Sequence, residues 1–190
     1  SYDFTSSYPT VMVCEKFPMS KSKYIGSVSV EALKYYAQNY CCLFDLKLTN
    51  VISKYTFENT ISFSKCFRIK NYVLNNGRVF SAEELFTTIT ELDFEVICKF
   101  YNFDDIEIRN LYIYEKDYLP KSFIMAILKL YNDKTQLKGV QGKEIEYLHS
   151  KEMLNSCYGM TVTDLLNDEY IYKNDEWTTK ETNIDNAIED

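Results

Sequence analysis

Residues 2–9 read YDFTSSYP, a pattern in which one carboxylate, Asp3, is followed at once by hydroxyl side chains, a tyrosine and a proline. Proline is favoured in the first turn of a helix, because its ring presets φ and it lacks an N–H that would go unpaired there. The stretch therefore predicts a short strand over 2–6 and a helix over 7–15. The Asp3 carboxylate could simply cap that helix, or it could face a partner elsewhere in the chain.

The partner stretch lies far along the chain, where residues 151–160 read KEMLNSCYGM. Lys151, Asn155 and Tyr158 are spaced i, i+4, i+7 and so share one face of a helix. A cation, an amide and an aromatic ring match the phosphate, the polar edge and the flat base of a nucleotide. In the alternative interpretation Lys151 is a solvated lysine, and Tyr158 anchors a helix that ends at Gly159.

Two further lysines, Lys134 and Lys138, lie one turn apart on the helix that precedes this stretch. Between residues 134 and 151 lysines outnumber glutamates, which reverses the acidic balance of the chain as a whole. A triphosphate needs such a concentration of cations. A solvated lysine face is the alternative interpretation.

Together the two stretches resemble the first two motifs of family B DNA polymerases. The pattern D-x-x-S-x-Y-P is filled by Asp3, Ser6, Tyr8 and Pro9, and K-x-x-x-N-S-x-Y-G is filled by Lys151, Asn155, Ser156, Tyr158 and Gly159. The long insertion after the first motif, and a hairpin-like segment after the second, resemble the protein-primed subgroup of phages and linear plasmids.

The resemblance implies an α+β fold: a partial polymerase palm with an α/β insertion and an antiparallel two-helix fingers hairpin. We expect the first palm strand and helix over 1–16, and the insertion with further palm elements over 17–115. The fingers helix pair is expected over 116–159. The start of a second insertion, with a β-hairpin and a frayed tail, is expected over 160–190.

The resemblance also implies the roles of the first-motif residues. Asp3 corresponds to the catalytic carboxylate that binds two Mg²⁺ ions, with the carbonyl of Phe4 beside it. The backbone of Ser6 and Ser7 corresponds to a segment near the incoming triphosphate. Tyr8 corresponds to the residue that lies under the sugar and excludes a ribose 2′-OH by its bulk.

Lys151 resembles the family's triphosphate-binding lysine, and Lys138 or Lys134 resembles its upstream partner. Asn155 and Tyr158 are expected to pack against the nascent base pair. The implied partners are template and primer DNA, a deoxynucleoside triphosphate (dNTP) and a terminal priming protein, and the implied location is the cytoplasm of the host cell. His149 has no visible catalytic partner.

The sequence departs from the family pattern in two places. Met160 follows Gly159 where the family often has lysine, and no Y-x-D-T-D-S motif follows. We therefore expect a piece of a longer protein, without its exonuclease domain, that is inactive alone and exposes apolar surface through which it could self-associate.

Composition excludes several classes of protein. The net charge of −7 argues against a generic nucleic-acid coat, although a local basic groove is compatible with it. Six cysteines without a CxxC pair, and one histidine, supply poor zinc ligands, so we expect reduced, apolar cysteines. No apolar run approaches the length of a membrane span.

The middle of the chain predicts mainly strands. Residues 43–48 and 60–80 alternate between apolar and polar, with a hairpin turn at Asn75-Asn76-Gly77, and residues 106–115 form another strand. Residues 17–26 predict polar turns. Thr90 and Asp93 occupy the positions of a capping box before a helix. Helices are expected over 119–138 and 143–158, and a hairpin over 169–183 that turns near Asn174-Asp175.

Two other functions remain open at this point. The insertion could be a binding module that contacts a priming protein or duplex DNA without doing chemistry. The chain could also be an unrelated α+β protein in which both motifs arise by chance. That last hypothesis predicts that Asp3 and the Lys151 face of the later helix lie far apart in space, with no cleft between them.

Overall fold

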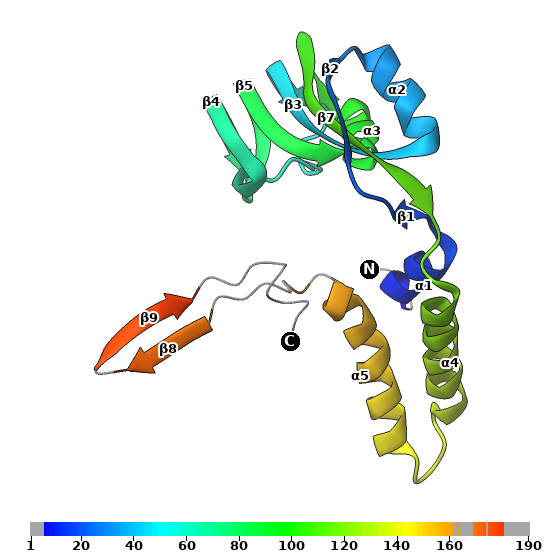
Figure 1. The fold of residues 1–190 in the computed structure, drawn as a ribbon. Coiled ribbons are helices and arrows are strands. Elements are labelled where there is room, and N and C mark those ends of the chain that lie inside the picture. The colour runs from blue at the N-terminus through cyan, green and yellow to red at the C-terminus, as the bar shows by residue number, and fades with distance from the viewer. Residues whose placement is uncertain (1–5, 162, 164–168, 174, 181–190) are drawn as a thin grey trace. The chain divides into compact units, whose positions relative to one another are not determined.

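The computed structural model describes residues 6–161, 163, 169–173 and 175–180 (Figure 1). Helices and strands are both abundant, as the expected α+β class requires. The chain divides into two compact units, and each is described by itself below. One unit is Cys14–Leu119, and the other joins Ser1–Val13 to Pro120–Asp190. The strand expected over 2–6 lies outside the described residues except for Ser6, which is in a turn.

The unit Cys14–Leu119 is built on one seven-stranded antiparallel sheet. Its strands are β1 (Phe17–Pro18), β2 (Lys23–Val28), β3 (Tyr40–Ser53), β4 (Cys66–Asn75), β5 (Arg78–Thr90), β6 (Tyr101–Asn102) and β7 (Asp105–Asp117). The strand order is β1-β7-β3-β5-β4, while β2 also pairs with β7 and β6 with β3. The helices are α2 (Val30–Asn39), α3 (Glu91–Phe100) and a short 3₁₀ turn, η1 (Phe63–Lys65).

The alternating stretch over 43–48 forms the centre of the longest strand, β3. Phe44, Leu46 and Leu48 are buried, whereas Leu43 is exposed on the other face, as a period of two requires. The predicted turn between β4 and β5 is confirmed. Asn76 and Gly77 adopt φ angles of 47° and 72°, the left-handed conformation that a tight hairpin turn needs.

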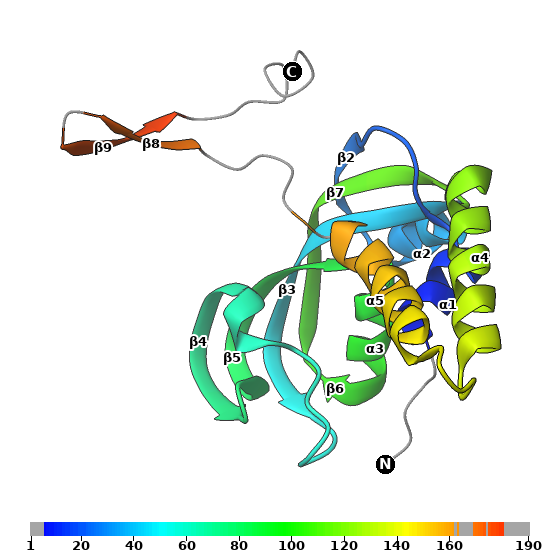
Figure 2. The same cartoon turned by 90° about the horizontal axis from the view of Figure 1, so that it is seen from below.

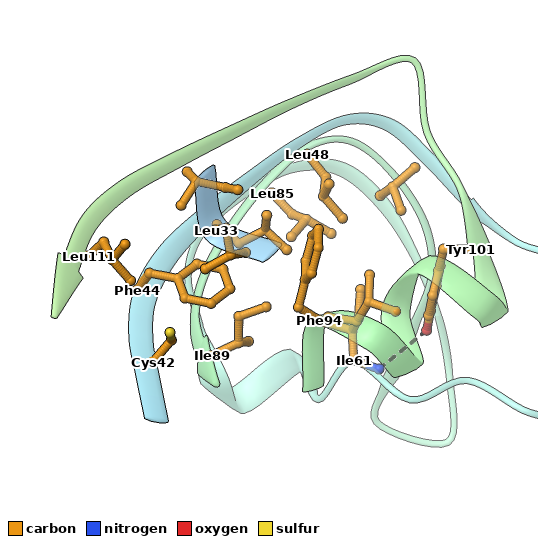
Figure 3. Close-up of a cluster of buried hydrophobic side chains, with 14 of the residues drawn as sticks. Leu33, Cys42, Phe44, Leu48, Ile61, Leu85, Ile89, Phe94, Tyr101 and Leu111 are labelled. Atoms are coloured by element: carbon orange, nitrogen blue, oxygen red, sulfur yellow. Dashed lines mark hydrogen bonds between the residues drawn. The ribbon is translucent and has the colours of Figure 1, made fainter. Parts of the chain in front are cut away.

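The core of this unit lies between the sheet and its two helices (Figure 3). Leu33 of α2 and Phe94 of α3 pack with Phe44 and the neighbouring aliphatic side chains. Burial raises the pKa of the Cys42 thiol to about 11, with a further contribution from the nearby Glu91 carboxylate, so the thiol stays neutral at physiological pH. The six cysteines are all free thiols, as expected.

The buried Tyr101 hydroxyl joins three segments of this core. It accepts hydrogen bonds from the backbone N–H groups of Thr60 (3.0 Å) and Ile61 (3.3 Å), and it donates one to the carbonyl of Val79 (2.7 Å). The bond to Ile61 is the dashed line in Figure 3. One phenol thus pairs backbone groups of the loop before η1 with strand β5.

The sequence patterns were wrong for the N-terminal part of this unit. Residues 17–26, expected to form turns, contribute β1 and most of β2, because both strands pair with the long strand β7. Helix α2 was not predicted, and its signal is Ser29, whose side chain accepts a hydrogen bond from the N–H of Ala32. The capping box of Thr90 and Asp93 at the start of α3 is confirmed.

The other unit contains α1 (Ser7–Cys14, of which Ser7–Val13 belong to it), α4 (Lys121–Leu137), α5 (Glu144–Thr161) and the hairpin strands β8 (Glu169–Lys173) and β9 (Glu176–Lys180). Helices α4 and α5 lie side by side and antiparallel in both views (Figures 1 and 2), which confirms the predicted helix hairpin. Gly139 and Gly142 allow the turn between them, with φ angles of 75° and 78°.

The structure corrects the predicted end of α5 and confirms part of the predicted C-terminal hairpin. Helix α5 continues to Thr161, so Gly159 lies inside the helix and does not follow its end. The hairpin over 169–183 is confirmed as far as Lys180, with Asp175 in the turn, whereas Asn174 and the tail lie outside the described residues. No helix in the described part of the chain is long and apolar enough to cross a membrane.

Candidate functional site

Lys134 of α4 and Ser6 of the first motif meet directly in the unit that contains α1, α4 and α5. The Lys134 ammonium donates a hydrogen bond to the Ser6 hydroxyl at 2.6 Å, although 128 positions separate the two residues. The same ammonium lies 5.3 Å from the centre of the Tyr131 ring, within cation–π range. Both contacts hold the end of a side chain that is otherwise long and flexible.

Ser6 lies immediately before α1, where a serine usually caps the helix. Its hydroxyl would normally accept a hydrogen bond from the N–H of the second or third helical residue. The third residue here is Pro9, which has no N–H. The Ser6 hydroxyl is instead occupied by Lys134, while the Ser6 carbonyl accepts from the N–H and the hydroxyl of Thr10, each at 3.0 Å.

The electrostatics of this position favour an anion. A helix N-terminus carries partial positive charge from its unpaired N–H groups, so a neighbouring ammonium adds a second positive charge. Two like charges held together are unfavourable in themselves. The Lys134 ammonium beside the start of α1 therefore forms a place where a phosphate group would relieve the repulsion.

A second contact joins the two predicted motifs. The Tyr8 ring of α1 stacks on the Tyr158 ring of α5, with centroids 4.0 Å apart and planes 13° from parallel. Tyr8 is 57% exposed and Tyr158 is half-buried, so the pair is open to solvent on one side. The stack brings the two motif stretches together. The separation of Asp3 from the Lys151 face, on which the hypothesis of chance motifs depends, lies outside the described residues.

The remaining predicted residues in the described region are on the surface. Lys151 and Asn155 are exposed on the helical turns of α5 before Tyr158, and Ser7 is exposed at the start of α1. Lys138 is the exposed C-cap residue of α4, one turn beyond Lys134. Of the two upstream lysines, only Lys134 contacts a first-motif residue within the part of the chain that is described.

Asp3 and Phe4, which the resemblance assigns to the metal ions, lie outside the described residues. Within the described ranges, no three histidine, cysteine, aspartate or glutamate side chains gather into a group that could hold a metal ion. The described residues therefore do not make a metal centre by themselves.

The family model for DNA polymerase type B, organellar and viral, matches residues 1–190. The chain belongs to this family of type B DNA polymerases. No curated protein matches it. The family match agrees with the resemblance carried by the two motifs, and the model matches the insertion between them as well.

Among solved structures, this chain is similar to phi29 DNA polymerase. The complex with primer-template DNA gives a TM-score of 0.67 at 18% identity, covering 94% of this chain and 29% of that one. The ternary complex with primer-template DNA and incoming nucleotides gives 0.68 at 18% identity, covering 94% and 30%. The chain therefore spans less than a third of the length of these two polymerase chains, and at this identity the likeness concerns the fold.

Sequence reasoning missed two features of the candidate site. It assigned Ser6 a role through its backbone, whereas its side chain makes the contact with Lys134. It also placed Tyr131 only in the apolar stripe of its helix, whereas the Tyr131 ring lies one turn before Lys134 on α4 and faces the ammonium. The i, i+3 spacing of a tyrosine and a lysine was a usable signal for that pair.

Proposed function

We propose that the chain is part of a DNA-directed DNA polymerase that adds dNTPs to a primer terminus or a protein-primed terminus. The observation that carries this proposal is the joining of the two motif stretches, through Tyr8 on Tyr158 and Ser6 on Lys134. These contacts gather aromatic, hydroxyl and cationic groups in one place. The family membership, and the phi29 polymerase complexes with DNA and nucleotides, support the same substrates.

In this proposal, different described residues contact different parts of the nucleotide. Lys134 and Lys151 would neutralise the triphosphate, and the N–H groups at the start of α1 would add donors. Tyr8 would lie under the sugar, and Asn155 with Tyr158 would contact the base pair. In this role the protein positions the reacting groups and stabilises developing charge, which is the main contribution of proteins to phosphoryl transfer.

Divalent metal is part of this proposal through residues that lie outside the described ranges. The Asp3 carboxylate and the Phe4 carbonyl are hard oxygen ligands of the kind that Mg²⁺ prefers. Bound there, two such ions would supply Lewis-acid activation of the phosphate. Further carboxylates are needed for a complete site, and residues 160–190 contain no Y-x-D-T-D-S motif. We therefore propose that the chain alone does not extend a primer.

Primer extension by the full-length polypeptide that carries this sequence tests the proposed function. Lys151→Ala should raise the KM for dNTP about 10- to 100-fold, because a charge-assisted contact to phosphate contributes about 1.5–3 kcal/mol. The matched control is Lys121→Ala, an exposed lysine at the start of α4, which should leave KM unchanged. An unchanged KM in Lys151→Ala would contradict the proposal. So would robust extension by the 190 residues alone with Mg²⁺.

A second candidate function belongs to the unit Cys14–Leu119, which could contact a priming protein. Strand β4 is at one end of the strand order, and Phe67 and Tyr72 on it are 61% and 45% exposed. Exposed aromatic side chains beside an open strand edge suit a protein partner. A pull-down with the priming protein tests this, and equal retention of the Phe67→Ala variant would contradict a role for that edge.

A further inference from the structure

We propose that Ser6 is a positioning residue, whose hydroxyl holds the Lys134 ammonium at the start of α1 and so makes Lys134, not Lys138, the upstream phosphate-binding lysine. This inference rests on the proposed nucleotide-binding function. It assigns the Ser6 side chain a role of its own, and it decides between two lysines that the sequence leaves equivalent.

The hydrogen bond to Ser6 orients the Lys134 ammonium. An ammonium on a four-carbon chain loses considerable rotamer entropy when it is confined. The Ser6 hydroxyl at 2.6 Å and the Tyr131 ring at 5.3 Å confine Lys134 in advance of any ligand. A phosphate arriving at this position would then meet a cation that is already oriented, which lowers the entropy cost of binding.

The backbone of Ser6 adopts an unfavourable conformation for a serine. Its φ of 54° lies in the left-handed region, which a serine adopts only at a cost in energy. Glycine would adopt this conformation freely, but glycine has no hydroxyl. A serine at this position therefore raises the conformational energy of the backbone relative to glycine. What serine adds over glycine is its hydroxyl, and that hydroxyl accepts a hydrogen bond from Lys134.

The Ser6 hydroxyl does not play the usual capping role. Pro9 leaves no N–H at the third helical position, and among the described residues the Ser6 hydroxyl makes its hydrogen bond with Lys134 and none with the N–H of Tyr8 at the second position. The hydroxyl is thus available to a partner from another helix. Lys138, one turn further along α4, is an exposed C-cap residue that makes no contact with Ser6 in the part of the chain that is described.

Three substitutions of Ser6 separate the hydroxyl from the backbone. Ser6→Ala removes the acceptor, and Ser6→Gly removes it while suiting the left-handed φ. Ser6→Asn restores an acceptor in a residue that tolerates this region. With the full-length polypeptide, we expect Ser6→Ala and Ser6→Gly to raise the KM for dNTP about 3- to 10-fold. This is the range of one ordinary hydrogen bond, because the hydroxyl acts on the phosphate only through Lys134. Ser6→Asn should recover part of the loss, with kcat changed less than KM.

A double-mutant cycle then identifies the partner. Ser6→Gly should have no further effect on KM in a Lys134→Ala background, and its full effect in a Lys138→Ala background. A readout independent of activity is the acylation rate of each lysine, followed by mass spectrometry. Lys134 should react more slowly than Lys138 in the wild type, and the difference should shrink in Ser6→Gly.

The outcomes distinguish the two proposals. Suppose that Lys134→Ala raises KM. The positioning role alone would then be overturned by any of three results: a wild-type KM in Ser6→Gly, additive effects of Ser6→Gly and Lys134→Ala, or coupling of Ser6 to Lys138. Unchanged KM in both Lys134→Ala and Lys151→Ala would overturn the proposed nucleotide site, and the positioning role with it.

Discussion

The rings of Tyr8 and Tyr158 lie face to face, with centroids 4.0 Å apart and planes inclined by 13°. One ring comes from the first turn of α1 and the other from the last turns of α5, so two distant parts of the sequence meet in one flat, partly exposed pair. Aromatic rings of this kind offer flat surfaces for stacking. Under the proposed function, substitutions in this pair should alter the choice of nucleotide.

Replacing Tyr8 should change selection between deoxy- and ribonucleotides. Tyr8→Ala removes the bulk proposed to exclude a 2′-OH, and we expect discrimination against ribonucleotides to fall about 10- to 100-fold, the range for steric selection in a pocket. Primer extension with matched dNTP and NTP substrates by the full-length polypeptide measures this ratio. Tyr8→Phe keeps the ring and the stack on Tyr158, so it should retain most of the discrimination. Equal ratios for Tyr8→Ala and wild type would refute a role of Tyr8 under the sugar.

Removing the Tyr101 hydroxyl should destabilise the unit Cys14–Leu119. Tyr101→Phe leaves two backbone N–H groups and one carbonyl without their partner inside the protein, which costs about 1–3 kcal/mol. Chemical denaturation measures the change, and faster amide exchange at Thr60 and Ile61 should accompany it. The control Tyr35→Phe alters a side chain that is 66% exposed and should have little effect. Equal stability of the two variants would contradict this account.

The capping box at the start of α3 should make a smaller contribution. Thr90→Ala removes the acceptor for the N–H of Asp93, and we expect the free energy of unfolding to fall by about 1 kcal/mol. Thr56→Ala, in an exposed segment outside any helix or strand, is the matched control. If the free energy of unfolding depends on denaturant concentration with the same slope in Thr90→Ala as in the wild type, the loss of stability arises in the folded state. Equal free energies of unfolding in the two variants would show that the cap does not stabilise the protein.

Acid should lower the free energy of unfolding of the unit Cys14–Leu119, because it protonates two glutamates that pair with cations on the sheet. The ion pair with Lys70, whose ammonium lies 2.8 Å from a carboxylate oxygen of Glu84, holds the pKa of Glu84 below its ordinary value of 4.5. Hydrogen bonds from Lys47 and Arg109 likewise lower the pKa of Glu107. A lowered pKa means that the stabilisation is complete above the ordinary value and is lost as the pH falls through the lower value of the folded state.

Unfolding experiments across this acidic range test the prediction. The free energy of unfolding should decline as the pH drops below about 4.5, the ordinary carboxyl pKa. The decline should be shallower in a Glu84→Gln, Glu107→Gln double variant, because those groups no longer titrate. Glu58→Gln, an exposed glutamate, is the control and should keep the wild-type slope. The same slope in all three proteins would show that these ion pairs do not differ between the folded and unfolded states.

Local signals in the sequence predicted the elements whose causes are themselves local. The turn at Asn75-Asn76-Gly77, the capping box at Thr90 and the glycine break between α4 and α5 depend on residues a few positions apart. Strands β1 and β2 were missed because each forms by pairing with β7, nearly a hundred positions further along the chain. Helix α2 was missed because a short amphipathic helix merges with the alternating pattern of β3.

The sequence by itself determined the family of this chain, because the two motifs and their order are read from residue identity alone. It also set the residue types available to bind a nucleotide. Only the tertiary structure decided which of them meet: Tyr8 on Tyr158, and Ser6 on Lys134 rather than on Lys138. The reason is geometric, since residues 128 positions apart come together only through the packing of α1 with the helix hairpin, and that packing selects one of two equivalent lysines.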